Sequence, residues 1–140
     1  MTVATPKHFY PVAIFSLLWA TMGCVDYTMT QGANEAYLEA FSAEELEYFN
    51  NLPIWVVAAW ALAVWSALLA SVLLLFKKQF AITVFLFSLL SMIVSHSYTY
   101  VFSNGAEVMG GSSSLIMPTA ILLLAIFFWR YAAFIVRPTV

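Results

Sequence analysis

The chain has 140 residues, of which 64% are hydrophobic and 9% are charged, and its formal net charge is −2. A soluble domain of this length needs a mostly polar surface, so the composition excludes an ordinary soluble protein and predicts one membrane-embedded domain. The small net charge and the lack of a basic patch give no reason to expect nucleic acid as a partner.

Four segments are long and apolar enough to cross a bilayer as helices, which takes about 20 residues each. In chain order they are about 9–30, 53–76, 80–102 and 115–136. We therefore expect an all-α integral membrane four-helix bundle, which forms a single transmembrane domain over residues 1–140.

The first span ends near the sequence "TMGC", which is similar to the cleavage region of a lipoprotein signal. In that alternative the span would be removed and Cys24 would carry lipid. Thr21 stands three residues before the cysteine, where a leucine is usual, so we expect an intact first helix. Cys24 is the single cysteine of the chain, which excludes an intramolecular disulfide and a CxxC motif.

The loop at 31–52 contains "QGANEAYLEAFSAEELEYFNN" and is the largest segment outside the predicted spans. Asn34 is placed to cap a first short helix, and Ser42 with Glu45 forms the capping box of a second. We expect two short amphipathic helices that rest on the mouth of the bundle or on the lipid headgroups. Membrane topology alone explains the acidic face of this loop, and a cation funnel or docking surface is the functional alternative.

The second and fourth spans carry signals for the start of a helix. Asn51 is placed to cap the second span, with Pro53 in its first turn. The Gly-Gly-Ser-Ser-Ser segment at 110–114 supplies caps for the fourth span. Pro118 falls in the first turn of that span, where its missing N–H leaves no helical hydrogen bond unmade.

Small residues recur every four positions in the second span, which places them on one stripe where helix backbones can approach closely. The stripe comprises Ala59, Ala63, Ala67 and Ser71. The third span carries serines at similar spacing, which indicates a packing surface first and a polar path second. Trp60 and Trp65 lie deeper in the second span, so each indole N–H needs a partner or a position facing lipid.

Charged residues divide by sign between the two ends of the predicted bundle. The basic residues lie at one set of span ends: Lys7, Lys77, Lys78, Arg130 and Arg137. The acidic residues lie at the opposite ends: Asp26, Glu35, Glu39, Glu44, Glu45, Glu47 and Glu107. Because basic residues stay on the cytoplasmic side, we expect both termini in the cytoplasm and the loop 31–52 outside.

Asp26 and His96 are ionisable residues expected at membrane depth. Asp26 lies seventeen residues beyond Phe9, and His96 lies seventeen residues beyond Gln79, the residue before its span, which is about 26 Å in each case at 1.5 Å per residue. In a hydrocarbon core of about 30 Å, the two side chains should therefore share one level just below the outer surface. Tyr100 lies one turn beyond His96, and Glu107 and Glu35 are expected at the rim of the same candidate polar site.

This candidate polar site has three interpretations. Both ionisable side chains can reach the headgroup layer, they can pair and hold two helices together, or they can bind a proton or another cation. A histidine with carboxylates is chemically adequate for zinc, but the spacing fits no known ligand motif. We therefore expect no metal and no cofactor.

Three segments carry a resemblance to a known group: "DYTMTQGANEAYLEAFSAEELEYF", "WVVAAWALAVWSALLASVLLL" and "SNGAEVMG". The chain resembles small four-span bacterial inner-membrane proteins, some of which are labelled sugar transporters, over roughly residues 9–130. The resemblance implies the four-helix fold and a bacterial inner membrane. It implies no mechanism and no functional residues for this chain.

The functional expectation is a non-enzymatic accessory or structural membrane protein with an acidic polar site on its outer side. The alternative is a transporter or channel for a small solute or cation, coupled to protons through Asp26 and His96. One chain of four helices leaves little room for a path, so that alternative requires an oligomer. No nucleophile–base pair, nucleotide loop or metal motif indicates an enzyme. The expected partner is the lipid bilayer, with a homo-oligomer or a larger membrane complex left open.

Overall fold

The computed structural model describes residues 5–32, 39, 41–103, 105–108, 111 and 115–136. Within these ranges all regular secondary structure is helical, and four of the helices are long and apolar enough to cross a membrane. The predicted all-α four-helix class is therefore confirmed. Helix length and composition make the chain a multi-pass membrane protein.

The spans are α1 (Phe9–Gln31), α4 (Ile54–Leu75), α5 (Phe80–Ser97) continued by the π-helical turn η1 (Tyr98–Phe102), and α7 (Ile116–Val136). Each span begins and ends within one residue of the range expected from the sequence. Two short helices, α3 (Ala43–Asn50) and α6 (Gly105–Val108), connect spans. α3 is the second of the two short helices expected in the loop 31–52. The helix expected to begin at Asn34 falls outside the described residues.

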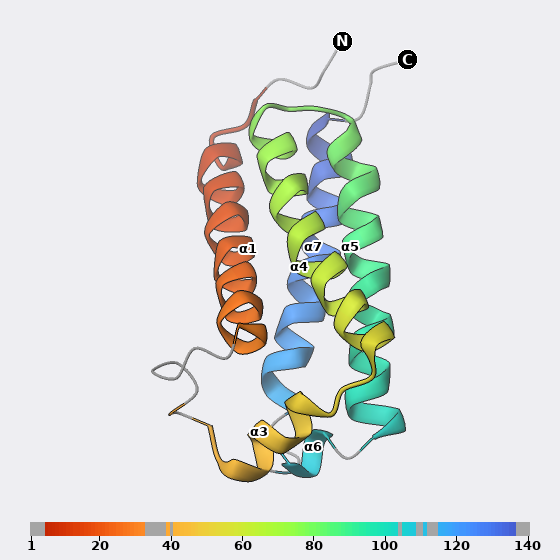
Figure 1. Cartoon of the computed structure of the whole chain (residues 1–140). Coiled ribbons are helices and arrows are strands. Elements are labelled where there is room, and N and C mark those ends of the chain that lie inside the picture. The colour runs from red at the N-terminus through yellow and green to blue at the C-terminus, as the bar shows by residue number, and fades with distance from the viewer. Residues whose placement is uncertain are drawn as a thin grey trace.

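The start of α1, the end of α7 and the α4–α5 turn lie at one end of the bundle, and α3 and α6 lie at the other (Figure 1). We call these the terminal end and the α3 end. Helix α4 packs against α1 on one side and α5 on the other, and α5 packs against α7. The helices are thus neighbours in the order α1, α4, α5, α7, and the seam between α1 and α7 is made by large side chains.

The main hydrophobic core fills the terminal half of the bundle. Its buried members come from all four spans: Phe9, Ala13, Ala70, Leu74, Ala81, Val84, Phe85, Phe128, Tyr131, Ala132, Ile135 and Val136. The ring of Phe128 lies 5.9 Å from that of Phe15 and 6.1 Å from that of Phe85. His8 Nδ1 lies 2.7 Å from the Tyr131 hydroxyl. These contacts join α7 to α5, to α1 and to the residue before α1 in the terminal half.

Helix α4 is held between its neighbours by its small side chains and by hydrogen bonds that two of its consecutive backbone carbonyls accept. Of the predicted stripe, Ala59, Ala63 and Ser71 are buried and Ala67 is partly buried. The Ser88 hydroxyl of α5 donates to the Ala63 carbonyl at 2.6 Å. The Cys24 thiol of α1 donates to the Val64 carbonyl at 3.2 Å. The close approach that small residues permit is therefore used on both sides of α4.

The prediction that Asn51 caps the second span is wrong. Pro53 is the N-cap of α4, and it has no side-chain cap hydrogen bond. The Asn51 side chain instead donates to the Glu47 carbonyl at 2.9 Å, so it closes the end of α3. An asparagine between two helices suits either terminus, and here the open carbonyls of α3 lie within reach. At the start of α3, the Ser42 hydroxyl accepts from the Glu45 N–H at 3.1 Å, as the predicted capping box requires.

The α4–α5 turn is a Schellman motif with a lysine at the position that usually holds glycine. The Lys77 N–H bonds the Leu74 carbonyl and the Lys78 N–H bonds the Leu73 carbonyl, both at 2.8 Å. Lys77 has φ 57°, in the left-handed region. Its ammonium donates to the Thr5 hydroxyl, so the turn is tied to the segment before α1.

Candidate functional site

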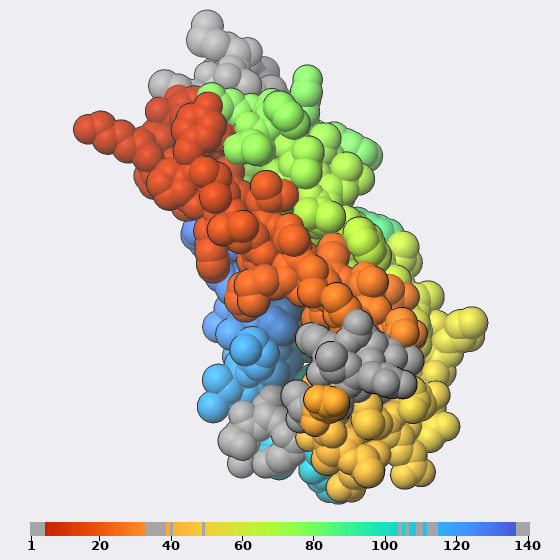
Figure 2. Space-filling model, turned by 60° about the vertical axis from the view of Figure 1, so that its left-hand side comes forward, coloured from red at the N-terminus to blue at the C-terminus, as the bar shows by residue number. Residues whose placement is uncertain are grey.

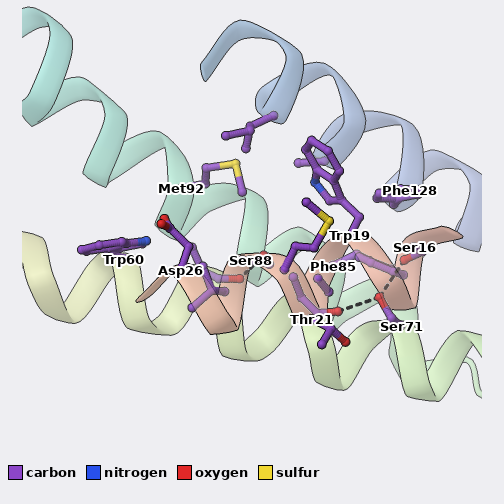
Figure 3. Close-up of a pocket in the computed structure, with 18 of the residues that line it drawn as sticks. Ser16, Trp19, Thr21, Asp26, Trp60, Ser71, Phe85, Ser88, Met92 and Phe128 are labelled. Atoms are coloured by element: carbon purple, nitrogen blue, oxygen red, sulfur yellow. Dashed lines mark hydrogen bonds between the residues drawn. The ribbon is translucent and has the colours of Figure 1, made fainter. Parts of the chain in front are cut away.

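A pocket of about 590 Å³ lies among the four spans and is lined by residues from each of them. Figure 3 shows its two ends: Asp26 and Trp60 lie at one, and Ser16, Ser71 and Phe128 lie at the other. Ser16 and Asp26 are ten residues apart on α1, which corresponds to about 15 Å along the helix. The pocket therefore runs from the level of Asp26 toward the middle of the bundle, where the core begins.

The deep end of the pocket is closed by two hydrogen-bonded serines. The Ser16 and Ser71 hydroxyls lie 2.6 Å apart, and both side chains are buried. Ser71 also donates to the Ala67 carbonyl of its own helix at 2.8 Å. With these hydroxyls bonded to each other and to α4, the remaining wall at this depth is set by Phe85 and Phe128.

The shallow end of the pocket holds a carboxylate next to an aromatic wall. Asp26 and Trp60 both line the pocket, and the indole nitrogen of Trp60 points toward the Asp26 carboxylate (Figure 3). The Trp60 ring stands edge-to-face with Tyr27, at 4.9 Å between centroids and an interplanar angle of 86°. The tyrosine of α1 thus fixes the orientation of the tryptophan of α4.

His96 lines the same pocket from α5, so the structure brings both predicted ionisable residues to one cavity. Its ring lies 5.7 Å from that of Tyr100, and it is hydrogen-bonded to the backbone of Met92, one turn earlier. A direct bond between Asp26 and His96 stays a prediction. His96 and Tyr100 also line a second pocket, of about 220 Å³, between α5 and α7.

The other predicted members of the polar site lie elsewhere or outside the described residues. Glu107 is exposed on α6 and does not line the large pocket. Tyr100 lines the second pocket and not the first. Glu35 lies outside the described part of the chain. The site that the structure assembles from the described residues is therefore Asp26, Trp60 and His96 around one cavity.

The α3 end is tied together by contacts that the sequence analysis did not anticipate. The Tyr48 hydroxyl of α3 lies 2.6 Å from that of Ser103, directly after η1. A Cβ at Gly105 would lie 2.5 Å from the Thr99 carbonyl oxygen, so only glycine lets α6 approach η1 this closely. The π-helical geometry of η1 widens the helix one turn after His96, which is a frequent feature of functional segments.

The pocket reaches the surface between α1 and α7. Met22 of α1 and Met117 of α7 both line it, and they are 64% and 60% exposed. In Figure 2, α1 crosses the front of the molecule and α7 comes to the surface beside its lower part. Because both helices are membrane spans, this opening faces sideways, toward the lipid.

Sequence reasoning identified Asp26 and His96 but missed the cavity between them. The available signal was Trp60, an indole at membrane depth that needed a polar partner. Trp65, one and a half turns further along α4, is 47% exposed and takes the lipid-facing position. Among the described residues, no three His, Cys, Asp or Glu side chains come together in a group that could hold a metal ion.

Comparison with protein-family models, with curated proteins and with solved structures finds no match to this chain. The geometry of the pocket is therefore the basis on which a function is argued.

Proposed function

We propose that this protein is a non-enzymatic accessory component of a bacterial inner membrane that holds a small amphiphilic molecule in the pocket among its four spans. The observation that carries the proposal is the pocket of about 590 Å³, with Asp26 and His96 at its shallow end and apolar walls below them. Ligand sites in proteins are typically concave, largely apolar, about 300–1,000 Å³ in volume and equipped with a few polar groups. An amphiphile has the matching division into a head and a tail.

The packing of the bundle favours holding a molecule over passing it across the membrane. Below the Ser16–Ser71 bond, buried side chains such as Phe9 and Leu74 fill the terminal half. A path through one copy of the chain would have to displace this core. The transport alternative would therefore use the pocket as a binding site and would need a second copy to complete a route.

We also propose that both termini are cytoplasmic and that the α3 end faces outward. The support is the distribution of charge: Lys7, Lys77 and Lys78 belong to the terminal end, whereas Glu44 and Glu47 lie on α3. The resemblance to small four-span bacterial inner-membrane proteins supports the same membrane. In this orientation the pocket opens toward the outer leaflet.

The proposed function is tested by filling the pocket. The protein is placed in phosphatidylcholine nanodiscs and titrated calorimetrically with decyldimethylamine N-oxide at a pH at which this amphiphile has no net charge. Ala125 lines the pocket from α7, and Ala125→Phe should weaken binding by about tenfold or more. Ala133→Phe is the matched control, because Ala133 is equally half-buried on α7 but lies outside the pocket lining.

Saturable binding to the wild type that is lost in Ala125→Phe and kept in Ala133→Phe would support the proposal. Binding no greater than that of empty nanodiscs, or equal binding by all three proteins, would overturn it.

A further inference from the structure

The residues that line the pocket favour a ligand of one charge over the other. Asp26 is the one acidic residue among the described residues that line the cavity, and none of them is a lysine or an arginine. An anionic head group would meet this carboxylate and no lysine or arginine in the described lining, in surroundings of low dielectric. A positive head group would meet an opposite charge in the same place.

The aromatic wall beside Asp26 adds a second preference for a cation. The faces of indole rings attract alkylated ammonium groups, and a desolvated setting strengthens this attraction. Trp60 is held upright by its edge-to-face contact with Tyr27, so its ring is in place before a ligand arrives. A carboxylate with a fixed indole is a small version of the aromatic sites that recognise quaternary ammonium groups.

The shape of the cavity defines the rest of the molecule. From Asp26 to Ser16 the pocket follows α1 for about 15 Å, with apolar side chains such as Phe85 at the deep end. Its opening between Met22 and Met117 faces the lipid. Methionine side chains adapt readily to apolar molecules of different outline, which suits an entrance for a flexible chain.

We propose that the pocket binds a cationic amphiphile, with its ammonium group against the Asp26 carboxylate and the face of the Trp60 ring and its alkyl chain directed toward the Ser16–Ser71 bond. The molecule enters sideways from the bilayer through the seam between α1 and α7. This inference rests on the proposed function and names the class of ligand for the same pocket.

The experiment compares two amphiphiles that have the same tail and nearly the same head size. Decyltrimethylammonium carries a positive charge, and decyldimethylamine N-oxide is neutral overall. Both are titrated calorimetrically into phosphatidylcholine nanodiscs that contain the full chain, with empty nanodiscs as the blank. The wild type should bind the cation about tenfold more tightly than the N-oxide, through the carboxylate and the indole face.

Two substitutions measure how much the Asp26 carboxylate and the Trp60 indole each contribute to the preference for the cation. Asp26→Asn should bring the affinity for the cation most of the way down to that for the N-oxide, with the remainder due to the indole, and leave the N-oxide affinity unchanged. Glu44→Gln removes an exposed charge of α3 outside the pocket lining and should change neither affinity. Trp60→Leu should also reduce the preference for the cation, whereas Trp65→Leu, on the lipid-facing side of the same helix, should not. If Asp26→Asn does not yield folded protein, the two tryptophan variants carry the test.

The outcomes separate this inference from the proposed function. A preference for the cation that falls in Asp26→Asn and in Trp60→Leu, and is kept in Glu44→Gln and Trp65→Leu, supports the inference. Equal binding of both probes by the wild type, or decyl sulfate binding as tightly as the cation, overturns the inference and leaves the proposed function standing. If none of the probes binds saturably, both proposals fail.

Discussion

At the scale of single residues, the buried hydroxyls form a directed chain that crosses from α1 to α4. Ser71 donates its one hydrogen to the Ala67 carbonyl, so Ser16 must be the donor in the bond between the two serines. Such a chain of hydrogen bonds stabilises the protein where water is absent, because both buried hydroxyls have a hydrogen-bond partner inside the bundle. The same two serines close the deep end of the pocket. They therefore contribute both to the stability of the bundle and to the shape of the pocket.

The Ser16–Ser71 bond should show up as an energetic coupling. In a double-mutant cycle of Ser16→Ala and Ser71→Ala, we expect a coupling of about 0.5–1.5 kcal/mol in the free energy of unfolding. The measurement is reversible unfolding in mixed detergent micelles. Thr21→Val is the control, because Thr21 is exposed and bonds the Leu17 carbonyl of its own helix. Strict additivity of the two serine substitutions would contradict a shared bond.

At the scale of the elements, α4 organises the bundle because it contacts two other spans and offers small residues to both. Ala63 is 2% exposed, and its carbonyl accepts a hydrogen bond from Ser88 of α5. Ala59, one turn earlier on the same stripe, is 8% exposed and does not line the pocket, so a larger side chain there has no cavity to enter and would push a neighbouring helix away. Ala58, on the same helix, is exposed and has no neighbouring span to displace.

Ala59→Leu should therefore lower stability by about 1–3 kcal/mol, the usual range for overpacking a close contact. The identical change at Ala58 should alter stability by less than about 0.5 kcal/mol, as is usual for exposed positions. Thermal unfolding of the two variants in the same detergent makes the comparison. Similar effects at both positions would mean that the stripe of small residues does not form the helix interface.

At the scale of the whole molecule, the bundle is asymmetric along its axis. The terminal half is packed around aromatic rings such as Phe128, and the α3 half encloses the pocket. The ends also differ in charge, with Lys77 and Lys78 at one and α3 with its glutamates at the other. Packing and charge thus both differ between the two ends of the bundle. The orientation of the chain in the membrane therefore decides which leaflet the pocket opens toward.

The orientation can be measured by labelling single cysteines in intact cells. In a Cys24→Ser background, which keeps a donor for the Val64 carbonyl, Ala43→Cys and Glu107→Cys should react with a membrane-impermeant maleimide. Gln79→Cys, in the α4–α5 turn, should react after the cells are opened and not before. All three positions are exposed in the structure, so a lack of reaction reports the side of the membrane. The reverse pattern would contradict cytoplasmic termini.

The sequence by itself determined the class, the number and the bounds of the spans. Long apolar runs can satisfy their backbone in lipid only as helices, so their length specifies where α1 and α7 begin and end. The constant rise of a helix also placed Asp26 and His96 at one level, and the structure finds both on one pocket. These are properties of each helix taken alone, which is why composition and counting are enough to predict them.

Tertiary structure alone decided which helices are neighbours and where they leave space. The spacing of small residues indicated the packing face of α4, but the apolar pattern of α1 does not distinguish the face that meets α4 from the face that borders the pocket, because lipid accepts any apolar residue. The contact of Trp60 with Tyr27 and the seam at Met22 and Met117 both depend on contacts between residues distant in the chain. In lipid, apolar residues can face outward as well as inward. The pattern of hydrophobic residues therefore says little about how each helix is rotated about its own axis, and this rotation is set by packing between helices.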